Sequence, residues 1–466
     1  MTASHDPRAQ GASSGARRQA ASVVFACEPT RFEYHPLGGR GFVRHTQSPN
    51  RRCWHALLRG PIAAATGLEL GSVARADHDR LSSAHGAEDF ARLPPEASPA
   101  DRAYPTFVRH YHDGDPSRVA DLLEAADGAL VIGFELAPST LRHIEARGGA
   151  YLSLMNHPYR FLDDLGTVVG SNRPEAIEAL MPWALRPAEV EAARDQTIAM
   201  AAMRVSLPEW LPPGTVLVAG QLGADGSVVA RGRFLTLRDA WPALLARCRA
   251  APFTIIAPHP LGGDAGETER ALLAELCGRG MISRLNPYGL IADGRVTEVI
   301  ALSSSLLAEA ECFGVRATAL LRPPSKAEFG FAATVSLPGN AVRAVAPWRA
   351  VAGALGLPVM GREVRPEPPM APLRAVVGLD WGLGDLKRAR LGEPVPRVID
   401  LAGLATACAT DEAFVEAAFP LLFDRPYHSW HDDGWHVRHV GQIGRTAAIR
   451  AWLASEEAVS RGVTGL

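Results

Sequence analysis

The segment from residue 253 to residue 314 constrains the fold most, because it alternates strand and helix patterns within a short length. An apolar run from Phe253 to Ala257 ends abruptly at a proline, as a buried parallel strand ends at its carboxyl edge. A helix pattern follows over residues 267–276, and residues 296–302 predict the next strand. This alternation is typical of a parallel sheet with crossover helices, the layout of a nucleotide-binding half-domain.

Polar side chains come directly after both strands of this segment. His259 and Pro260 follow the first strand, and Ser303 and Ser304 follow the second strand and precede a helix. Because the carboxyl ends of parallel strands meet at one edge of a sheet, we expect these residues to lie close together. Hydroxyl groups and the free N–H groups of a helix start bind anions, so this edge predicts a phosphate–sugar pocket. The alternative to a pocket is purely structural: the His-Pro pair would only end the strand, and the serines would only cap the helix.

The composition fits a soluble globular protein of two or three domains. The chain has 466 residues, of which 47% are hydrophobic and 21% charged. The formal net charge of -2 gives no electrostatic reason to expect a nucleic-acid partner. The six cysteines are scattered without a Cys-x-x-Cys pair, so we expect reduced thiols in a cytoplasmic protein. No apolar run approaches the ~20 residues of a membrane-spanning helix.

A proline-rich linker at residues 211–214 separates two units that each alternate strand and helix patterns. We expect a disordered tail (1–21), a Rossmann-like domain (22–210), a second Rossmann-like domain (211–390) and a C-terminal extension of helices and loops (391–466). Residues 28–117 predict loops and short helices, and residues 335–372 predict irregular structure. The predicted fold class is therefore α/β, with two doubly wound domains facing a cleft.

Short motifs in a fixed order resemble the bacterial capsule and lipopolysaccharide Kdo transferases of the GT-B fold. They are Phe134-Glu135-Leu136-Ala137-Pro138, His157 to Asp164 with Ser171-Asn172, Gly220-Gln221 with Asp225 and Ser227, and His259-Pro260 with Ser303-Ser304, Glu309-Ala310 and Gly314. A weaker likeness is Leu373-Arg374 with Trp381-Gly382. The family moves 3-deoxy-manno-octulosonic acid (Kdo) from CMP-Kdo to a growing glycan, and the likeness is to its retaining β-Kdo type. It spans roughly residues 130 to 385.

The resemblance implies a donor site in the second domain and an acceptor side in the first. The implied donor residues are His259, Pro260, Gln221, Ser303, Ser304 and Glu309. His259 would donate to the donor phosphate, and Glu309 would accept hydrogen bonds from the ribose. A CMP-ketose presents one phosphate and a good leaving group, so catalysis needs phosphate stabilisation more than a metal. Glu309 could equally be a solvated helix residue.

Two carboxylates are the implied catalytic pair. A retaining transferase needs a carboxylate nucleophile and a second acid/base group. The family has a catalytic aspartate after its Gly-Gln strand, which matches Asp225 here, and Glu135 is the natural partner from the opposing domain. The alternative for Asp225-Gly226 is a plain turn dipeptide.

A charged cluster contains His157, Arg160, Asp163 and Asp164. Arg160 could bind a sugar carboxylate in fork geometry, which suits an acidic donor or acceptor. Equally, Arg160 could form a structural ion pair with one of the two aspartates.

The C-terminal extension contains four histidines close to acidic and tryptophan residues: His428, His431, His436 and His439. Such a group could bind a metal, and Asp433-Gly434-Trp435-His436 is similar to the Asp-x-x-His block of SGNH-type esterases. The Gly-Asp-Ser nucleophile block of that family is absent. We therefore expect a solvated or acceptor-facing loop, and no metal site.

The expected function is a glycosyltransferase that needs no metal and no cofactor. Its donor would be CMP-Kdo or a related CMP-sugar such as CMP-sialic acid, and its acceptor a glycan or glycolipid of a surface polysaccharide. Peripheral association with the inner membrane or with a polysaccharide-assembly complex would fit this role. Two alternatives stay open: a UDP-sugar 2-epimerase of the same fold, and a non-catalytic glycan-assembly subunit.

Overall fold

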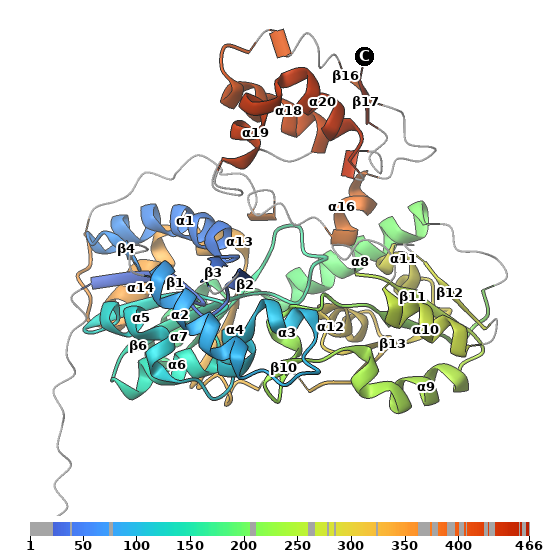
Figure 1. Cartoon of the computed structure of the whole chain (residues 1–466), viewed down its shortest axis with the longest axis horizontal. Coiled ribbons are helices and arrows are strands. Elements are labelled where there is room, and N and C mark those ends of the chain that lie inside the picture. The colour runs from blue at the N-terminus through green and yellow to red at the C-terminus, as the bar shows by residue number, and fades with distance from the viewer. Residues whose placement is uncertain are drawn as a thin grey trace, which may run out of the picture.

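Two α/β units lie side by side, with a small helical unit above them (Figure 1). The computed structural model describes residues 22–37, 40–73, 78–205, 211–259, 266–276, 279–283, 286–322, 325–361, 373–374, 381–388, 397–399, 405–406, 408–423, 427, 434–455, 457–458 and 463–465. The α/β class with parallel sheets agrees with the sequence-based prediction. Within these residues, no helix is long and apolar enough to cross a membrane.

The first sheet has six strands in the order β15-β7-β6-β5-β1-β4. They are β1 (Ser22–Cys27), β4 (Leu70–Ser72), β5 (Ala129–Phe134), β6 (Ala150–Asn156), β7 (Thr167–Ser171) and β15 (Ala333–Leu337). The four strands β4, β1, β5 and β6 are parallel, β7 runs antiparallel to β6, and β15 runs antiparallel to β7. Because β4 and β5 lie on opposite sides of β1, the strand order reverses between β1 and β5.

Helices cover both faces of the first sheet, as its apolar strands require. One face packs on α1 (Ser48–Thr66), α7 (Pro174–Leu180) and α14 (Val345–Ala354), and the other on α5 (Ala120–Ala125) and α6 (Pro138–Ala146). Trp54 of α1 stacks on Phe134 with ring centroids 5.0 Å apart, and both rings are buried. The remaining elements of this unit are β2 (Glu33–Leu37), β3 (Arg40–Arg44), α2 (His78–Ala91), α3 (Pro99–Ala103), α4 (Pro105–His110) and α13 (Gly339–Val342).

Two parts of this unit differ from the sequence-based expectation. The 19-residue helix α1 and the strand β4 lie in the region expected to be loops and short helices. Pro61 lies inside α1, yet the helix forms because it buries one apolar face against the sheet. The expected irregular region supplies β15, α13 and α14 to the first sheet, although the sequence analysis grouped these residues with the second unit.

The second sheet is fully parallel, with the strand order β12-β11-β8-β13-β14. Its strands are β8 (Thr215–Ala219), β11 (Thr254–Ala257), β12 (Gly280–Ile282), β13 (Val296–Ala301) and β14 (Arg316–Ala319). The associated helices are α8 (Pro187–Arg204), α9 (Trp241–Ala250), α10 (Glu267–Glu275), α11 (Pro287–Ala292) and α12 (Ser305–Cys312), with a short hairpin of β9 (Val229–Ala230) and β10 (Arg233–Phe234). The order reverses between β8 and β13, as in Rossmann-like sheets. The strands predicted around residues 215, 253 and 296 are confirmed.

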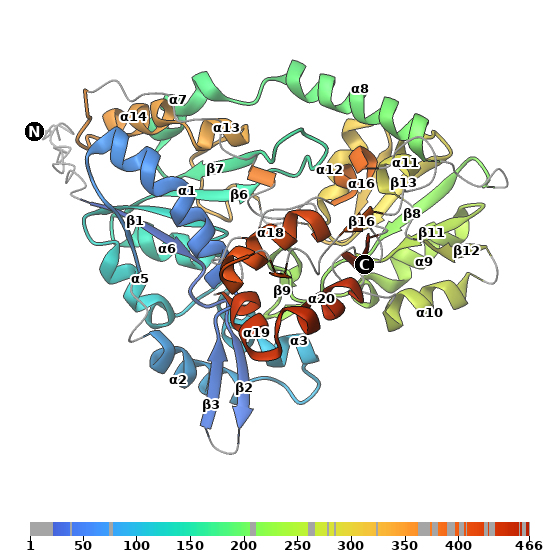
Figure 2. The same cartoon turned by 90° about the horizontal axis from the view of Figure 1, so that it is seen from above.

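The two units share apolar packing. Phe107 of α4 lies in one buried cluster with Phe234 of the second unit. Asp101 is buried in α3, and its Oδ1 accepts a hydrogen bond from the Phe234 N–H at 2.7 Å. From the other side, the loop between β6 and β7 inserts Phe161 into the second core. Figure 2 shows α8 crossing from the first unit to the second.

The C-terminal helices have a core of their own. They are α18 (Asp411–Phe423), α19 (Trp435–Ile443) and α20 (Arg445–Leu453), with α16 (Trp381–Arg388), β16 (Arg397–Ile399) and β17 (Val463–Gly465) along the same part of the chain. The His436 ring lies 4.8 Å from Phe419 and 5.8 Å from Trp452, whereas His439 stacks on Trp435 at 4.5 Å. His428 and His431 are outside the described residues.

The contact of Asp101 with the second unit predicts a stability defect. Asp101→Ala should lower the free energy of unfolding by about 2–3 kcal/mol, because it leaves the buried Phe234 N–H without its acceptor and removes the Asp101 side of the capping box that begins α3. Urea denaturation measures this effect. Asp113→Ala is the control, since the Asp113 side chain is fully exposed (100%). Equal stability of the two variants would contradict the interpretation.

Candidate functional site

Both sheets reverse their strand order at one point, and candidate residues follow the strands on either side of it. In the first sheet, Arg31 follows β1 and Glu135 follows β5. In the second sheet, Gln221 follows β8 and Ser303 follows β13. Open α/β sheets bind ligands in the crevice at such reversal points. The topology therefore identifies this region as the candidate site.

A hydrogen-bond network joins the two strand ends of the second sheet. The Gln221 side-chain amide donates to Ser227 Oγ and to Ser303 Oγ, both at 2.9 Å, and its Oε1 accepts from the Ser303 N–H at 3.1 Å. The hydroxyls of Ser227 and Ser303 are 3.0 Å apart. Ser304 caps α12 by accepting from the Leu306 N–H at 3.3 Å. The serines are thus ordered at the start of this helix, and Ser304 forms the helix cap that was the alternative to a phosphate contact.

His259 lies at the same edge of the sheet, because β11 is the neighbour of β8. A methyl group built on Gly220 would lie 3.0 Å from the His259 N atom and 3.2 Å from Glu269 Oε1, so the loops after β8 and β11 touch. Burial lowers the pKa of His259, and the charge of Asp225 opposes that shift. Pro260 lies outside the described residues.

Glu135 is held in a strained backbone conformation. Its φ angle is 52°, in the left-handed region that costs a non-glycine residue on the order of 1 kcal/mol. Its N–H donates to the Leu154 carbonyl at 2.9 Å, and its Oε2 accepts from Arg31 Nη1 at 3.2 Å. Burial raises the pKa of Glu135, Arg31 opposes this, and Asp225 adds to it. Strain at a residue of this kind is common in functional sites.

Asp225 comes from the facing unit. Its Oδ1 accepts from the Ser227 N–H at 2.8 Å and so caps a short turn, as the turn alternative predicted. Its negative charge also acts on the groups around it, because it raises the pKa of both Glu135 and the buried Tyr111. Asp225 and Glu135 therefore lie within electrostatic reach of each other across the two units.

Arg31 spans the two units, and the sequence analysis missed it. Its Nη1 donates to Glu135 Oε2 and its Nη2 donates to the Ala224 carbonyl, each at 3.2 Å. Its guanidinium also lies 5.4 Å from the centre of the Phe107 ring. The available signal was its place just after the apolar strand at residues 22–27, beside the strand that leads to Glu135.

Glu309 holds the two units together. It is 3% exposed, so it is not a solvated helix residue. Its Oε1 accepts from the Arg160 N–H at 2.6 Å and from the Tyr288 hydroxyl at 2.8 Å. Burial raises its pKa to about 7 against the effect of these bonds. The carboxylate thus fixes the loop of the first unit that contains Arg160.

The neighbouring residues of that loop are also fixed. His157 is buried, its Nδ1 accepts from the Tyr159 N–H at 3.1 Å, and burial lowers its pKa to about 4. Arg160 lies within electrostatic reach of both Glu309 and Glu135. Two paired contacts hold the aspartates of this cluster: Asp163 with Lys387 at 2.9 Å and Asp164 with Arg343 at 3.2 Å.

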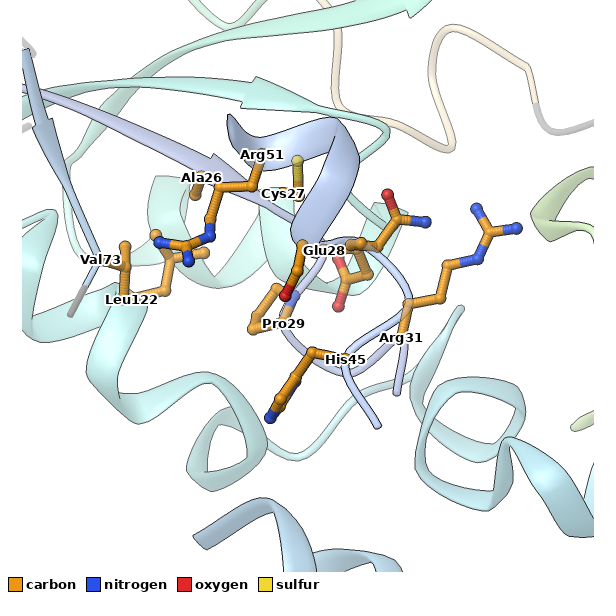
Figure 3. Close-up of a pocket in the computed structure, with 11 residues that line it drawn as sticks. Ala26, Cys27, Glu28, Pro29, Arg31, His45, Arg51, Val73 and Leu122 are labelled. Carbon is orange, nitrogen blue, oxygen red and sulfur yellow. The ribbon is translucent and has the colours of Figure 1, made fainter. Parts of the chain in front are cut away.

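A small cavity lies beside the site at the end of β1 (Figure 3). It has a volume of about 60 Å³, enough for a few water molecules but well below the ~300 Å³ of a small-molecule pocket. Figure 3 shows Arg31 and Arg51 pointing in different directions around it. The Glu28 carboxylate is engaged by Thr30 and by the Ala137 N–H. Among the described residues, no three His, Cys, Asp or Glu side chains gather closely enough to hold a metal ion.

Comparisons with known proteins give low similarity. No protein-family model and no curated protein matches the chain. Two solved structures of KpsC from Thermosulfurimonas dismutans are similar in part. The β Kdo 2,7 transferase has 15% identity and a TM-score of 0.28, covering 44% of this chain and 70% of its own. The β Kdo 2,4 transferase has 15% identity and a TM-score of 0.28, covering 48% of this chain and 78% of its own. These values establish neither the family nor the function.

The buried Glu309 predicts a pH-dependent stability. Its folded-state pKa of about 7 exceeds the ordinary value of 4.5, so the folded protein keeps this proton to a higher pH than the unfolded chain does. Its contribution to stability therefore falls as pH rises from about 4.5 to about 7. Glu309→Gln removes this titration, so its stability relative to wild type should rise by roughly 1–3 kcal/mol between pH 5 and pH 7.5.

Urea denaturation at the two pH values measures the change. Glu311→Gln is the matched control, because Glu311 is exposed on the same helix. A Glu309→Gln difference that stays constant with pH would show that this carboxylate does not titrate in that window.

Proposed function

We propose that this chain is a retaining glycosyltransferase of the GT-B type, which transfers Kdo or a related acidic sugar from a CMP-activated donor to a glycan or glycolipid. The observation that carries the proposal is the approach of Glu135 and Asp225 from facing units, with Arg31 bonded to both sides. Two carboxylates with separate positions are what a double displacement requires.

The proposed reaction has two steps. Asp225 attacks the anomeric carbon, and the bond to the CMP phosphate breaks with its electron pair leaving on the phosphate oxygen. The acceptor hydroxyl then attacks the same carbon, Glu135 takes its proton, and the bond to Asp225 breaks. Two inversions give net retention, for which the carboxyl groups of the closed enzyme need to approach to about 5–5.5 Å.

The proposed donor site is the strand-end edge of the second sheet. A single phosphate would fit against the His259 ring, the Ser303 and Ser304 hydroxyls and the start of α12. Gln221 orders this edge through its bonds to Ser303. N–H and O–H groups of this kind can stabilise the phosphate charge without a divalent ion. We therefore propose that the enzyme needs no metal. Glu309 would not touch the donor. It would position the loop of the first unit that contains Arg160.

The function is tested by calorimetric titration of CMP, UDP and GDP, followed by incubation with CMP-Kdo in the presence of EDTA. CMP binding with turnover of CMP-Kdo supports the proposal. Preferential binding of UDP would favour a UDP-sugar 2-epimerase instead. CMP binding without hydrolysis or transfer would indicate a non-catalytic subunit, and activity lost in EDTA but restored by manganese or magnesium would refute metal independence.

The proposed nucleophile predicts a selective loss of activity. Asp225→Asn should abolish transfer and prevent a covalent sugar adduct, while it changes CMP affinity less than about threefold, because the carboxylate meets the sugar and not the nucleotide. Intact-protein mass spectrometry after mixing with CMP-Kdo, together with rate measurements, checks this. Near-normal turnover by the variant would exclude the covalent mechanism.

The proposed phosphate contact makes a different prediction. His259→Ala should weaken CMP binding by roughly 1–3 kcal/mol, because it removes a half-buried donor to a charged phosphate. Calorimetry with wild type and variant measures the loss. The control is His55→Ala, since His55 belongs to α1 of the first unit and its Nε2 lies 2.8 Å from the Leu70 carbonyl. Equal CMP affinity for His259→Ala and wild type would remove His259 from the donor site.

A further inference from the structure

Arg31 contacts Glu135 directly and also contacts the residue that precedes Asp225 in the facing unit. Its side chain is 19% exposed, so part of the guanidinium reaches solvent. Its bond to Glu135 measures 3.2 Å, longer than the 2.7–2.9 Å typical of charged N–H···O bonds. A ligand carboxylate that makes a shorter bond to Arg31 could therefore replace the Glu135 carboxylate.

The second contact of Arg31 fixes it relative to the nucleophile. Its Nη2 donates to the carbonyl of Ala224, the residue that immediately precedes Asp225. The Phe107 ring on one side of the guanidinium is buried and limits its movement. A ligand carboxylate bound to this guanidinium would thus lie beside the carboxyl group of Asp225.

We propose that Arg31 recognises the carboxylate of the donor sugar, exchanging its bond to Glu135 for a bond to the substrate. The proposal rests on the glycosyltransferase function above and names its substrate class: sugars that bear a carboxylate on the anomeric carbon. In such a sugar the carboxylate is one bond from the carbon that Asp225 attacks. A cation beside Asp225 both orients that carbon and offsets the repulsion between the two negative groups.

The exchange also affects the acid/base group. Arg31 opposes the rise in the pKa of Glu135 that burial and Asp225 cause. When Arg31 turns to the substrate, Glu135 loses that stabilisation and becomes a stronger base for the acceptor proton. The sequence analysis offered Arg160 for the sugar carboxylate because of its fork geometry, with a structural ion pair as the equal alternative. That residue lies in the loop fixed by Glu309, and its charge reaches Glu135 from there.

The test compares Arg31→Gln and Arg31→Lys with wild type. The ligands are CMP, CMP-Kdo, free Kdo and the carboxamide of Kdo, in which the carboxylate is neutral. Arg31→Gln should raise the KM for CMP-Kdo roughly 10–100-fold and leave CMP affinity within about twofold. Wild type should bind Kdo more tightly than its carboxamide, and Arg31→Gln should bind the two equally. Arg31→Lys should restore part of the preference, because it keeps the charge but loses the fork.

Arg147→Gln is the control, since Arg147 forms an exposed pair with Asp127 away from the site. An Arg31→Gln variant that still prefers Kdo to its carboxamide would overturn the proposal. So would an equal loss of affinity for CMP, Kdo and the carboxamide together with a lowered Tm, because that pattern indicates a structural role alone. If wild type prefers Kdo to its carboxamide but turns over no CMP-sugar, the transferase function fails while carboxylate recognition by Arg31 stands.

Discussion

The separation of the two candidate carboxylates depends on how the first unit is anchored in the second, because each carboxylate belongs to a different sheet. The anchor is the loop between β6 and β7. Phe161 is buried in the second core, and the adjacent Arg160 N–H is held by Glu309. The aromatic ring supplies most of the favourable free energy through burial, whereas the buried carboxylate fixes the position of the backbone. Together with the packing of Phe107 on Phe234, this contact holds the two units close enough for Arg31 to reach both.

The site places two carboxylates near each other, and two arginines act on them. Burial raises the pKa of Glu135, and repulsion from the negative charge of Asp225 raises it further. Arg31 and, from farther away, Arg160 compensate this repulsion. Such an arrangement has a cost in stability that the left-handed backbone at Glu135 increases. Active sites commonly carry such costs, and the packed interface between the units offsets them here.

Much of the architecture could be predicted from local sequence, and the failures have a common cause. The buried strands β5, β8, β11 and β13 are apolar runs with clear ends, so their existence and approximate bounds followed from the pattern. The helix α1 was missed because three arginines and Pro61 obscure its apolar face. The strand β15 was missed because its partner β7 lies far away in the sequence.

The same limit applies to the site. His259, Gln221, Ser303 and Asp225 could be placed at one edge because each follows a recognisable strand. Arg31 bonds to a residue 104 positions away, and Glu309 bonds to a residue 149 positions away. Neither contact leaves a periodic signal in the sequence. Glu309 was therefore expected in the donor site, and its bonds to the protein interior became visible only in three dimensions.

The return of the chain to the first sheet has a consequence for synthesis on the ribosome. In the first unit, β15 pairs with the edge of β7, and α14 packs Trp348 into the core of the sheet. Both segments are synthesised only after all strands of the second sheet. The second sheet is continuous in the sequence from β8 to β14. During translation, the second sheet can therefore assemble while the first sheet still exposes an unpaired strand edge, which makes this interval a period of high risk for aggregation.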